Sequence, residues 1–250
     1  MAQVVLLTSE GASGAIAARY LAAQFPDIAV ICEATEPRWL FIRRRIRRLG
    51  VATVLGQVAF MVLQRFQQRG SQPRIADICA PMSNGADPAV THVTSVNSPE
   101  CRAALRELRP GVVLVMGTRI IKAEVLAETA APFINYHAGI TPKYRGVHGG
   151  YWALAEGDAG NFGVTVHVVD AGIDTGGILY QERIRPGTAD NFSTFPYLQL
   201  AAGLPLLAKA ARDALAGRLS LQGATTLPSR LWSHPTIWHY LATGFRRGVW

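Results

Sequence analysis

Short apolar runs alternate with helix-like stretches along most of the chain. The apolar runs of strand length are residues 4–8, 28–32, 111–116, 133–136, 163–170 and 178–184. Between the first four lie stretches with the character of helices, of which 15–24 and 98–108 are the clearest. Strands that alternate with helices predict a mostly parallel central sheet with helices on its faces. The sequence therefore predicts an α/β protein.

The first strand is followed by a turn of small residues, Ser9 to Gly14, and then by an alanine-rich helix. The glycine spacing is not GxGxxG, so the turn does not indicate a dinucleotide site. Its backbone N–H groups at the start of a helix could hold a phosphate or carboxylate, which makes Gly11 and Ser13 candidate substrate-binding residues. A tight turn without a ligand is the alternative.

A basic segment with arginines at 38, 43, 44, 45, 47 and 48 precedes an apolar run from Val51 to Leu63. This pattern predicts one or two helices, the first with a cationic face. One interpretation is a solvated basic face beside a helix that is buried in the domain or in a homodimer. A second is a membrane-surface contact through Arg43–Leu63. A third is a basic patch that attracts a phosphorylated substrate.

The remaining pattern predicts a loop over residues 67–83 and a helix over 195–215 that Pro205 interrupts. We expect two parts, a catalytic domain at 1–190 and a helical and loop extension at 191–250 that packs on it.

Composition narrows the partners and the compartment. With 250 residues, 49% of them hydrophobic, the chain can bury a full core. Lys and Arg outnumber Asp and Glu by 25 to 17, and the net charge of +8 favours anionic partners. The three cysteines form no CxxC motif, which predicts neither a disulfide framework nor a metal site and favours the cytoplasm. The sequence has no signal peptide pattern and no apolar run of about 18 residues that could cross a bilayer.

The chemistry is concentrated between Asn135 and Asp174. Asn135 and His137 are two residues apart at the end of a predicted strand, so their side chains project to the same side. Asp174, in a glycine-rich loop, could orient the imidazole and raise its pKa. This constellation predicts an acyl-transfer or hydrolytic site. His167 alternates with valines and is interpreted as a packed or hydrogen-bonded structural histidine, while the other histidines stay unassigned.

The motifs Asn-x-His at 135–137, Pro-x-Tyr-Arg-Gly at 142–146 and Asp-x-Gly-x-Asp-Thr-Gly-Gly at 170–177 resemble those of the folate-dependent formyltransferases. Residues 117–121 also resemble that family's pterin-binding segment. The resemblance covers about residues 111–184. It implies a Rossmann-like, mostly parallel α/β fold and a 10-formyltetrahydrofolate cofactor without a metal.

The resemblance also implies site roles. Asn135 and His137 would hydrogen-bond the formyl oxygen, and Asp174 would hold His137 and relay protons. The implied cofactor-binding residues are Thr118, Arg119, Ile120, Ile121, Asp170, Gly172 and Ile173. The implied substrate-binding residues are Tyr144, Arg145 and Gly146, in addition to Gly11 and Ser13.

We expect the acceptor to be a small anionic amine, such as a nucleotide-linked amino sugar, and no nucleic acid. Arg145 resembles the tRNA and amino-sugar enzymes more than the glycinamide ribonucleotide enzymes, and only 66 residues follow Ile184, which disfavours tRNA. Glycinamide ribonucleotide formylation, hydrolysis of formyltetrahydrofolate, and a membrane-surface binding protein on the same scaffold are the alternatives.

Overall fold

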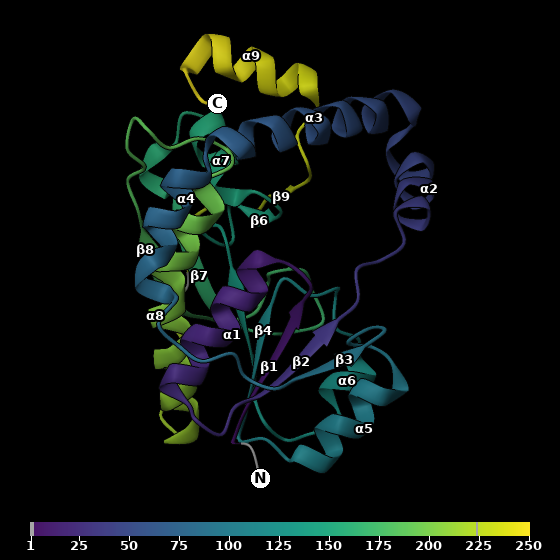
Figure 1. Cartoon of the computed structure of the whole chain (residues 1–250), viewed down its shortest axis with the longest axis vertical. Coiled ribbons are helices and arrows are strands. Elements are labelled where there is room, and N and C mark those ends of the chain that lie inside the picture. Colours follow the sequence, from purple (N-terminus) through teal and green to yellow (C-terminus); the bar gives the residue numbers. More distant parts are fainter. Residues whose placement is uncertain (1–2, 224) are drawn as a thin grey trace.

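The computed structural model describes residues 3–223 and 225–250, and only the backbone of residues 38, 40 and 41. Its centre is a seven-stranded sheet in the order β3-β2-β1-β4-β5-β7-β8 (Figure 1). The first five of these strands pair in parallel, whereas β7 and β8 are antiparallel. The strands are β1 (Val4–Ser9), β2 (Ala29–Glu33), β3 (Val90–Val93), β4 (Val112–Met116), β5 (Phe133–His137), β7 (Gly163–Val168) and β8 (Ile178–Arg183). The predicted α/β fold is confirmed.

Helices cover both faces of this sheet, and a further group lies beyond the carboxyl ends of the parallel strands (Figure 1). The helices are α1 (Ala12–Gln24), α2 (Arg38–Leu49), α3 (Val51–Gly70), α4 (Gln72–Cys79), α5 (Pro99–Leu108), α6 (Ala123–Leu126), α7 (Gly149–Ala155), α8 (Phe195–Leu215) and α9 (Ile237–Arg247), with short 3₁₀ turns at Ala80–Met82 and Ala159–Asn161. Among the described helices, none combines the length and apolar character needed to cross a bilayer.

The alternation of side chains along β1 divides the core into two layers. Val4 and Leu6 face a cluster that includes α1, α4 and α8, while Val5 and Leu7 face one that includes α5 and α6. Helix α8 contributes Leu204, so it belongs to the same core as the sheet. The division at residue 190 stays a prediction.

A third, aromatic cluster holds α3, α7 and α9 together. Phe60 of α3 lies 4.9 Å from the ring of Tyr240 of α9, and Tyr151 of α7 joins the same cluster. Strand β9 (Leu231–Trp232) also pairs with β6 (Arg145–Gly146). The C-terminal segment is therefore bound to the Tyr-Arg-Gly motif by backbone hydrogen bonds.

Two local predictions are wrong. The predicted loop at 67–83 is mostly helical, because α3 runs to Gly70 and α4 follows at once. Pro73 stands in the first turn of α4, where no backbone N–H is needed, and Ile75 and Cys79 bury one face. Helix α8 also continues through Pro205: burial of Leu204 and Leu207 outweighs the ~3 kcal/mol that an internal proline costs.

We expect Leu204→Ala to destabilise the protein by about 2–5 kcal/mol, because it leaves a cavity in the sheet–helix core. Leu55→Ala, at a side chain that is 64% exposed, is the matched control and should change stability by less than about 0.5 kcal/mol. Urea unfolding monitored by circular dichroism measures both. Equal losses in the two variants would contradict the assignment of α8 to the core.

Candidate active site

A cavity of about 550 Å³ lies at the carboxyl ends of β4 and β5. Parallel α/β sheets bind their ligands at this edge. The cavity is lined by the three predicted catalytic residues, by every predicted cofactor-binding residue, and by Ser13 and Gly146. Gly11, Tyr144 and Arg145, which the sequence also assigns to the site, are not among its lining residues.

Asp174 is the centre of the polar contacts in this cavity. Its Oδ2 accepts a 2.8 Å hydrogen bond from the backbone N–H of Gly146 and lies 3.4 Å from Nδ1 of His137. Its Oδ1 lies 3.5 Å from Nε2 of His167. The backbone of Asp174 is left-handed, with φ of 51°, a conformation that aspartate tolerates better than most residues. The loop therefore turns the carboxylate toward two histidines.

These contacts keep Asp174 ionised. Burial acts to raise its pKa, but the hydrogen bond from His167, the electrostatic influence of the His137 ring and the N–H of Gly146 outweigh burial and lower the pKa to about 2. The carboxylate is therefore a permanent negative charge at neutral pH.

His137 is buried between Asp174 and the backbone of the following turn. Its Nε2 lies 2.7 Å from the carbonyl of Tyr144, so Nε2 carries a proton and donates it. Burial lowers the pKa of His137, and this effect exceeds the opposing effects of Asp174 and of the Tyr144 carbonyl. The prediction that the carboxylate raises the pKa of this imidazole is wrong for the net shift, because desolvation is the larger contribution.

Gly139 makes the contact between His137 and Tyr144 possible. A Cβ at residue 139 would lie 2.4 Å from the Tyr144 carbonyl oxygen and 2.8 Å from Nε2 of His137. Only a glycine lets the two groups meet. The sequence analysis assigned no role to this residue.

Asn135 contacts His167 rather than His137. With its Oδ1 accepting from Nε2 of His167 at 3.0 Å, its Nδ2 donates to the carbonyls of Val115 and Tyr136 at 3.1 and 3.3 Å. The Nδ1 of His167 lies 2.9 Å from the Val168 carbonyl. Both ring nitrogens of His167 thus face oxygen atoms, Nδ1 the Val168 carbonyl and Nε2 the Asn135 and Asp174 side chains.

The burial and hydrogen bonds of His167 agree with its interpretation as a packed or hydrogen-bonded histidine, and the structure adds a position at the cavity. The ring is buried, yet it lines the cavity and joins Asn135 to Asp174. The β7–β8 pairing changes register between Val166 and His167, and such irregularities redirect side chains. The alternating valines gave no sign of this change.

Both predicted pterin-binding segments line the cavity, but the charged side chains of Arg119 and Asp170 are bound to other groups of the protein. The guanidinium of Arg119 is bound to Glu33 at 3.1 Å and to the carbonyl of Thr94 at 2.9 Å. Its charge is therefore already paired within the protein. Asp170 accepts from the N–H of Gly172 and the hydroxyl of Thr175. It therefore shapes the loop that carries Asp174.

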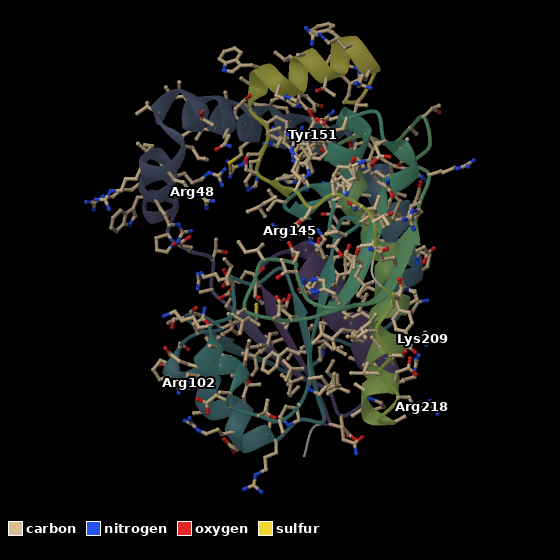
Figure 2. The ribbon with its side chains drawn as sticks, turned by 180° about the vertical axis from the view of Figure 1, so that it is seen from behind. Arg48, Arg102, Arg145, Tyr151, Lys209 and Arg218 are labelled. Atoms are coloured by element: carbon tan, nitrogen blue, oxygen red, sulfur yellow. The ribbon has the colours of Figure 1, made fainter. Side chains whose placement is uncertain are left out.

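Tyr144 and Arg145 lie outside the cavity lining, in contact with other parts of the protein. The ring of Tyr144 is fully buried and stacks on Trp232, and its hydroxyl donates to Asp158 at 2.8 Å. Arg145 lies in β6, near the middle of the molecule in Figure 2. The Nε of Arg145 is buried and has no hydrogen-bond partner among the described residues.

His148, which the sequence left unassigned, lies at the cavity wall and is 2.9 Å from His234 of the C-terminal segment. Burial, the neighbouring His234 and Arg45 lower the pKa of His148 to about 3. Burial and Arg45 lower the pKa of His234 to about 4. Both rings are therefore neutral at pH 7. Among the described residues, no group of three histidine, cysteine or acidic side chains is placed to hold a metal ion.

The sheet order and the position of the cavity at the carboxyl strand ends are those of a Rossmann-like α/β protein. The family model described as "Formyl transferase" matches residues 47–194, more than half of the chain. The chain belongs to this folate-dependent formyltransferase family, and the family predicted from the sequence motifs is confirmed.

Relatives by sequence match only part of the chain. A methionyl-tRNA formyltransferase from Kosmotoga olearia is 34% identical over 128 residues, which make up 51% of this chain and 41% of that protein. A methionyl-tRNA formyltransferase from Myxococcus xanthus is 29% identical over 177 residues, or 67% of this chain and 55% of that protein. The chain thus spans less than two thirds of either relative.

Solved structures share the fold over most of the chain. The glycinamide ribonucleotide transformylase 1 of Symbiobacterium toebii has a TM-score of 0.57 at 19% identity, covering 88% of this chain and 91% of that chain. An N-formyltransferase from Helicobacter canadensis, solved with folinic acid and dTDP-3-aminofucose, has a TM-score of 0.56 at 15% identity, covering 91% and 70%. At these identities the likeness establishes the fold.

We expect His167→Leu to raise the pKa of Asp174, because the hydrogen bond from His167 is the largest of the influences that lower it. A carboxylate whose folded pKa lies below its ordinary value of 3.8 stabilises the fold above that value, and the stabilisation is lost as pH falls toward 2. His167→Leu should therefore reduce the loss of stability on acidification between about pH 5 and pH 2. Carboxyl-carbon NMR titration measures the pKa directly.

His167→Gln is the matched control, since an amide keeps a hydrogen-bond donor but carries no charge. Its Asp174 pKa should lie between those of the wild type and His167→Leu. An unchanged pKa in both variants would show that His167 does not stabilise the carboxylate.

Proposed function

We propose that this protein transfers the formyl group of 10-formyltetrahydrofolate to an amine. The observation that carries the proposal is the convergence of Asn135, His137 and Asp174 on one cavity, in a chain that belongs to the formyl transferase family. The motif residues come from a strand end and from a loop 37 positions further on, and the fold brings them within 3.4 Å at His137 and Asp174.

The cavity suits a folate. Its volume of about 550 Å³ lies within the ~300–1,000 Å³ common for small-molecule sites. Val115, Met116 and Leu200 supply apolar walls for a flat ring, and the backbone of residues 117–121 and 170–173 would hold its polar edge. When bound, the folate would supply an electrophilic formyl carbon.

The transfer requires one proton to leave the amine and one to reach the folate nitrogen, as the new C–N bond forms and the old one breaks. Nε2 of His137 is fixed as a donor to the Tyr144 carbonyl, and the lowered pKa keeps the ring neutral, so Nδ1 can accept the amine proton. The resulting imidazolium would be stabilised by Asp174, 3.4 Å away, and would give the same proton to the folate nitrogen as the old C–N bond breaks. With a pKa of about 2, Asp174 is a weak base, and we assign it the role of a fixed anion instead of a relay.

Asn135 is the candidate donor to the formyl oxygen, where negative charge gathers during attack. Its Nδ2 now donates to the Val115 and Tyr136 carbonyls. In the opposite orientation of the amide, Nδ2 lies 3.0 Å from His167 and 3.4 Å from Asp174. A turn of the amide therefore presents a donor to the polar side of the cavity, and His167 must then accept this hydrogen bond instead of donating one.

An anionic group on the acceptor is supported by the start of α1. Its N-cap is Gly11, its first turn contains no acidic residue, and Ser13 lines the cavity. Helix N-termini favour negative charge. This arrangement and the net charge of +8 support a phosphorylated or nucleotide-linked small amine, with an amino sugar as the preferred class.

Methionyl-tRNA is the second candidate acceptor, because the relatives by sequence carry that activity in their names. A tRNA also satisfies the preference for an anionic partner. Assays with purified 10-formyltetrahydrofolate and separate acceptors distinguish the classes: a nucleotide-linked amino sugar, glycinamide ribonucleotide, methionyl-tRNA, and water alone.

We expect folate consumption only when an amine is present, with the highest kcat/KM for a nucleotide-linked amino sugar. A higher kcat/KM for methionyl-tRNA or glycinamide ribonucleotide would overturn the proposed acceptor but would leave the proposal of formyl transfer standing. Consumption at the same rate without any amine would identify a hydrolase. No consumption under any condition would refute formyl transfer.

We expect Asn135→Ala, His137→Ala and Asp174→Asn each to lower kcat/KM by about 10²- to 10³-fold, since each removes a donor, a base or a charge that acts at the reacting carbonyl. Leu55→Ala, distant from the cavity residues in sequence and exposed, is the control and should retain the wild-type rate. Circular dichroism verifies that the variants fold. Wild-type rates in all three would refute the assigned site.

A further inference from the structure

Helix α3 buries Val54 and Phe60 but leaves a second set of apolar side chains exposed to solvent. Five exposed apolar residues with spacings of four, three, four and four form one stripe, which we call the outer stripe: Val51, Leu55, Val58, Val62 and Phe66. Leu55 and Phe66 are 64% and 62% exposed, whereas Gln57 is 3% exposed. The outward side of a helix that serves only the fold carries polar residues instead.

Two glutamines on the inward side of α3, Gln57 and Gln67, hydrogen-bond to other segments. Gln57 accepts from Arg45 at 2.8 Å and donates to the carbonyl of His234 at 2.8 Å. Gln67 accepts from Tyr240 at 3.1 Å. These contacts fix the rotation of α3, so the outer stripe cannot turn inward without breaking them.

Two further helices extend the apolar surface at the same end of the molecule (Figure 1). On α2, Trp39, Ile42 and Ile46 are exposed at helical spacing. On α9, Trp238 and Phe245 lie seven residues apart and are 69% and 80% exposed. We call the exposed apolar residues of α2 and α9, together with the outer stripe, the distal face.

The charges beside the distal face are predominantly positive. No acidic residue occurs between residues 37 and 71 or after Asp213. Arg43, Arg47 and Arg48 are exposed on α2, and Figure 2 shows Arg48 on the helix that stands out from the body. Glu36, which precedes α2, pairs with Arg44 at 2.9 Å and leaves the other exposed arginines of α2 in excess. The face therefore combines apolar side chains with a surplus of cations.

We propose that the distal face docks on a bilayer that contains anionic phospholipid. Exposed tryptophan, phenylalanine and leucine side chains insert at the level of the headgroups, while arginines bind the lipid phosphates. The proposal goes beyond formyl transfer, and the residues of the distal face are separate from the three catalytic residues.

Other occupants satisfy only one of these two features. A second copy placed on the same face would bring two arginine-rich surfaces together without acidic partners. A nucleic acid would neutralise the arginines but leave the aliphatic outer stripe in water, since nucleic-acid sites use phosphate contacts and aromatic stacking. An anionic bilayer accepts both the apolar stripe and the cations.

Vesicle flotation of the full chain tests the proposal. We expect binding to vesicles of phosphatidylcholine mixed with phosphatidylglycerol at low salt, weaker binding at high salt because screening shortens electrostatic range, and none to phosphatidylcholine alone. Binding should also shift the tryptophan emission to the blue, and Trp39→Phe with Trp238→Phe should remove most of that shift.

The double variants Leu55→Gln/Val62→Gln and Arg47→Gln/Arg48→Gln should each weaken partitioning by at least about tenfold. Leu221→Gln and Arg218→Gln are the matched controls and should bind like the wild type, since both side chains are exposed and Arg218 lies at the end of the molecule opposite Arg48 (Figure 2). Formyl transfer in solution should be unchanged in both double variants, so failure of docking and failure of the proposed function are distinguishable.

Three results would overturn the proposal. One is the absence of flotation with anionic vesicles at low salt. Another is a dimer in sedimentation velocity that Leu55→Gln/Val62→Gln dissociates, which would make the face an interface between copies. The third is tRNA retention that Arg47→Gln/Arg48→Gln abolishes while vesicles of either composition fail to bind.

Discussion

The candidate site depends on one buried charge, the carboxylate of Asp174. A buried anion destabilises the fold unless hydrogen-bond donors or cations surround it. Removal of one such partner leaves the buried charge partly uncompensated. Here the partners come from separate segments: Gly146 from β6, His137 from the end of β5, and His167 from β7. The need to satisfy this carboxylate is therefore what fixes the mutual positions of the three segments.

The same burial sets the character of His137. In an exposed pair, the aspartate would favour the imidazolium, but here desolvation opposes the charged form and is the larger effect. Asp174 keeps its charge because it accepts several hydrogen bonds, whereas His137 has a single carbonyl acceptor and a carboxylate at 3.4 Å. The pair thus holds a neutral base beside a fixed anion, a combination that suits uptake of a proton during reaction.

Much of the fold and the centre of the site follow from local sequence signals. The alternation of apolar runs and helices gives the parallel sheet, and the spacing of Asn135 and His137 places both at one strand end. The positions of His167 and Tyr144 cannot be predicted from such local signals. A register shift in β7–β8 redirects His167, and the partner that buries Tyr144 is Trp232, 88 positions away in the chain. Neither effect has a signature in the neighbouring residues.

Helix α3 shows a different limit. The apolar run from Val51 to Leu63 predicts a helix, but periodicity alone does not decide which side is buried when both sides can pack. The aromatic cluster around Phe60 and the hydrogen bonds of Gln57 make that decision, and they leave Leu55 and Phe66 in water. Burial of apolar surface stabilises a protein by about 25 cal/mol per Å². The exposed side chains of α3 do not contribute this stabilisation, whereas polar side chains at the same positions would be well solvated. A surface retained at that cost is best explained by contact with something other than the protein's own core.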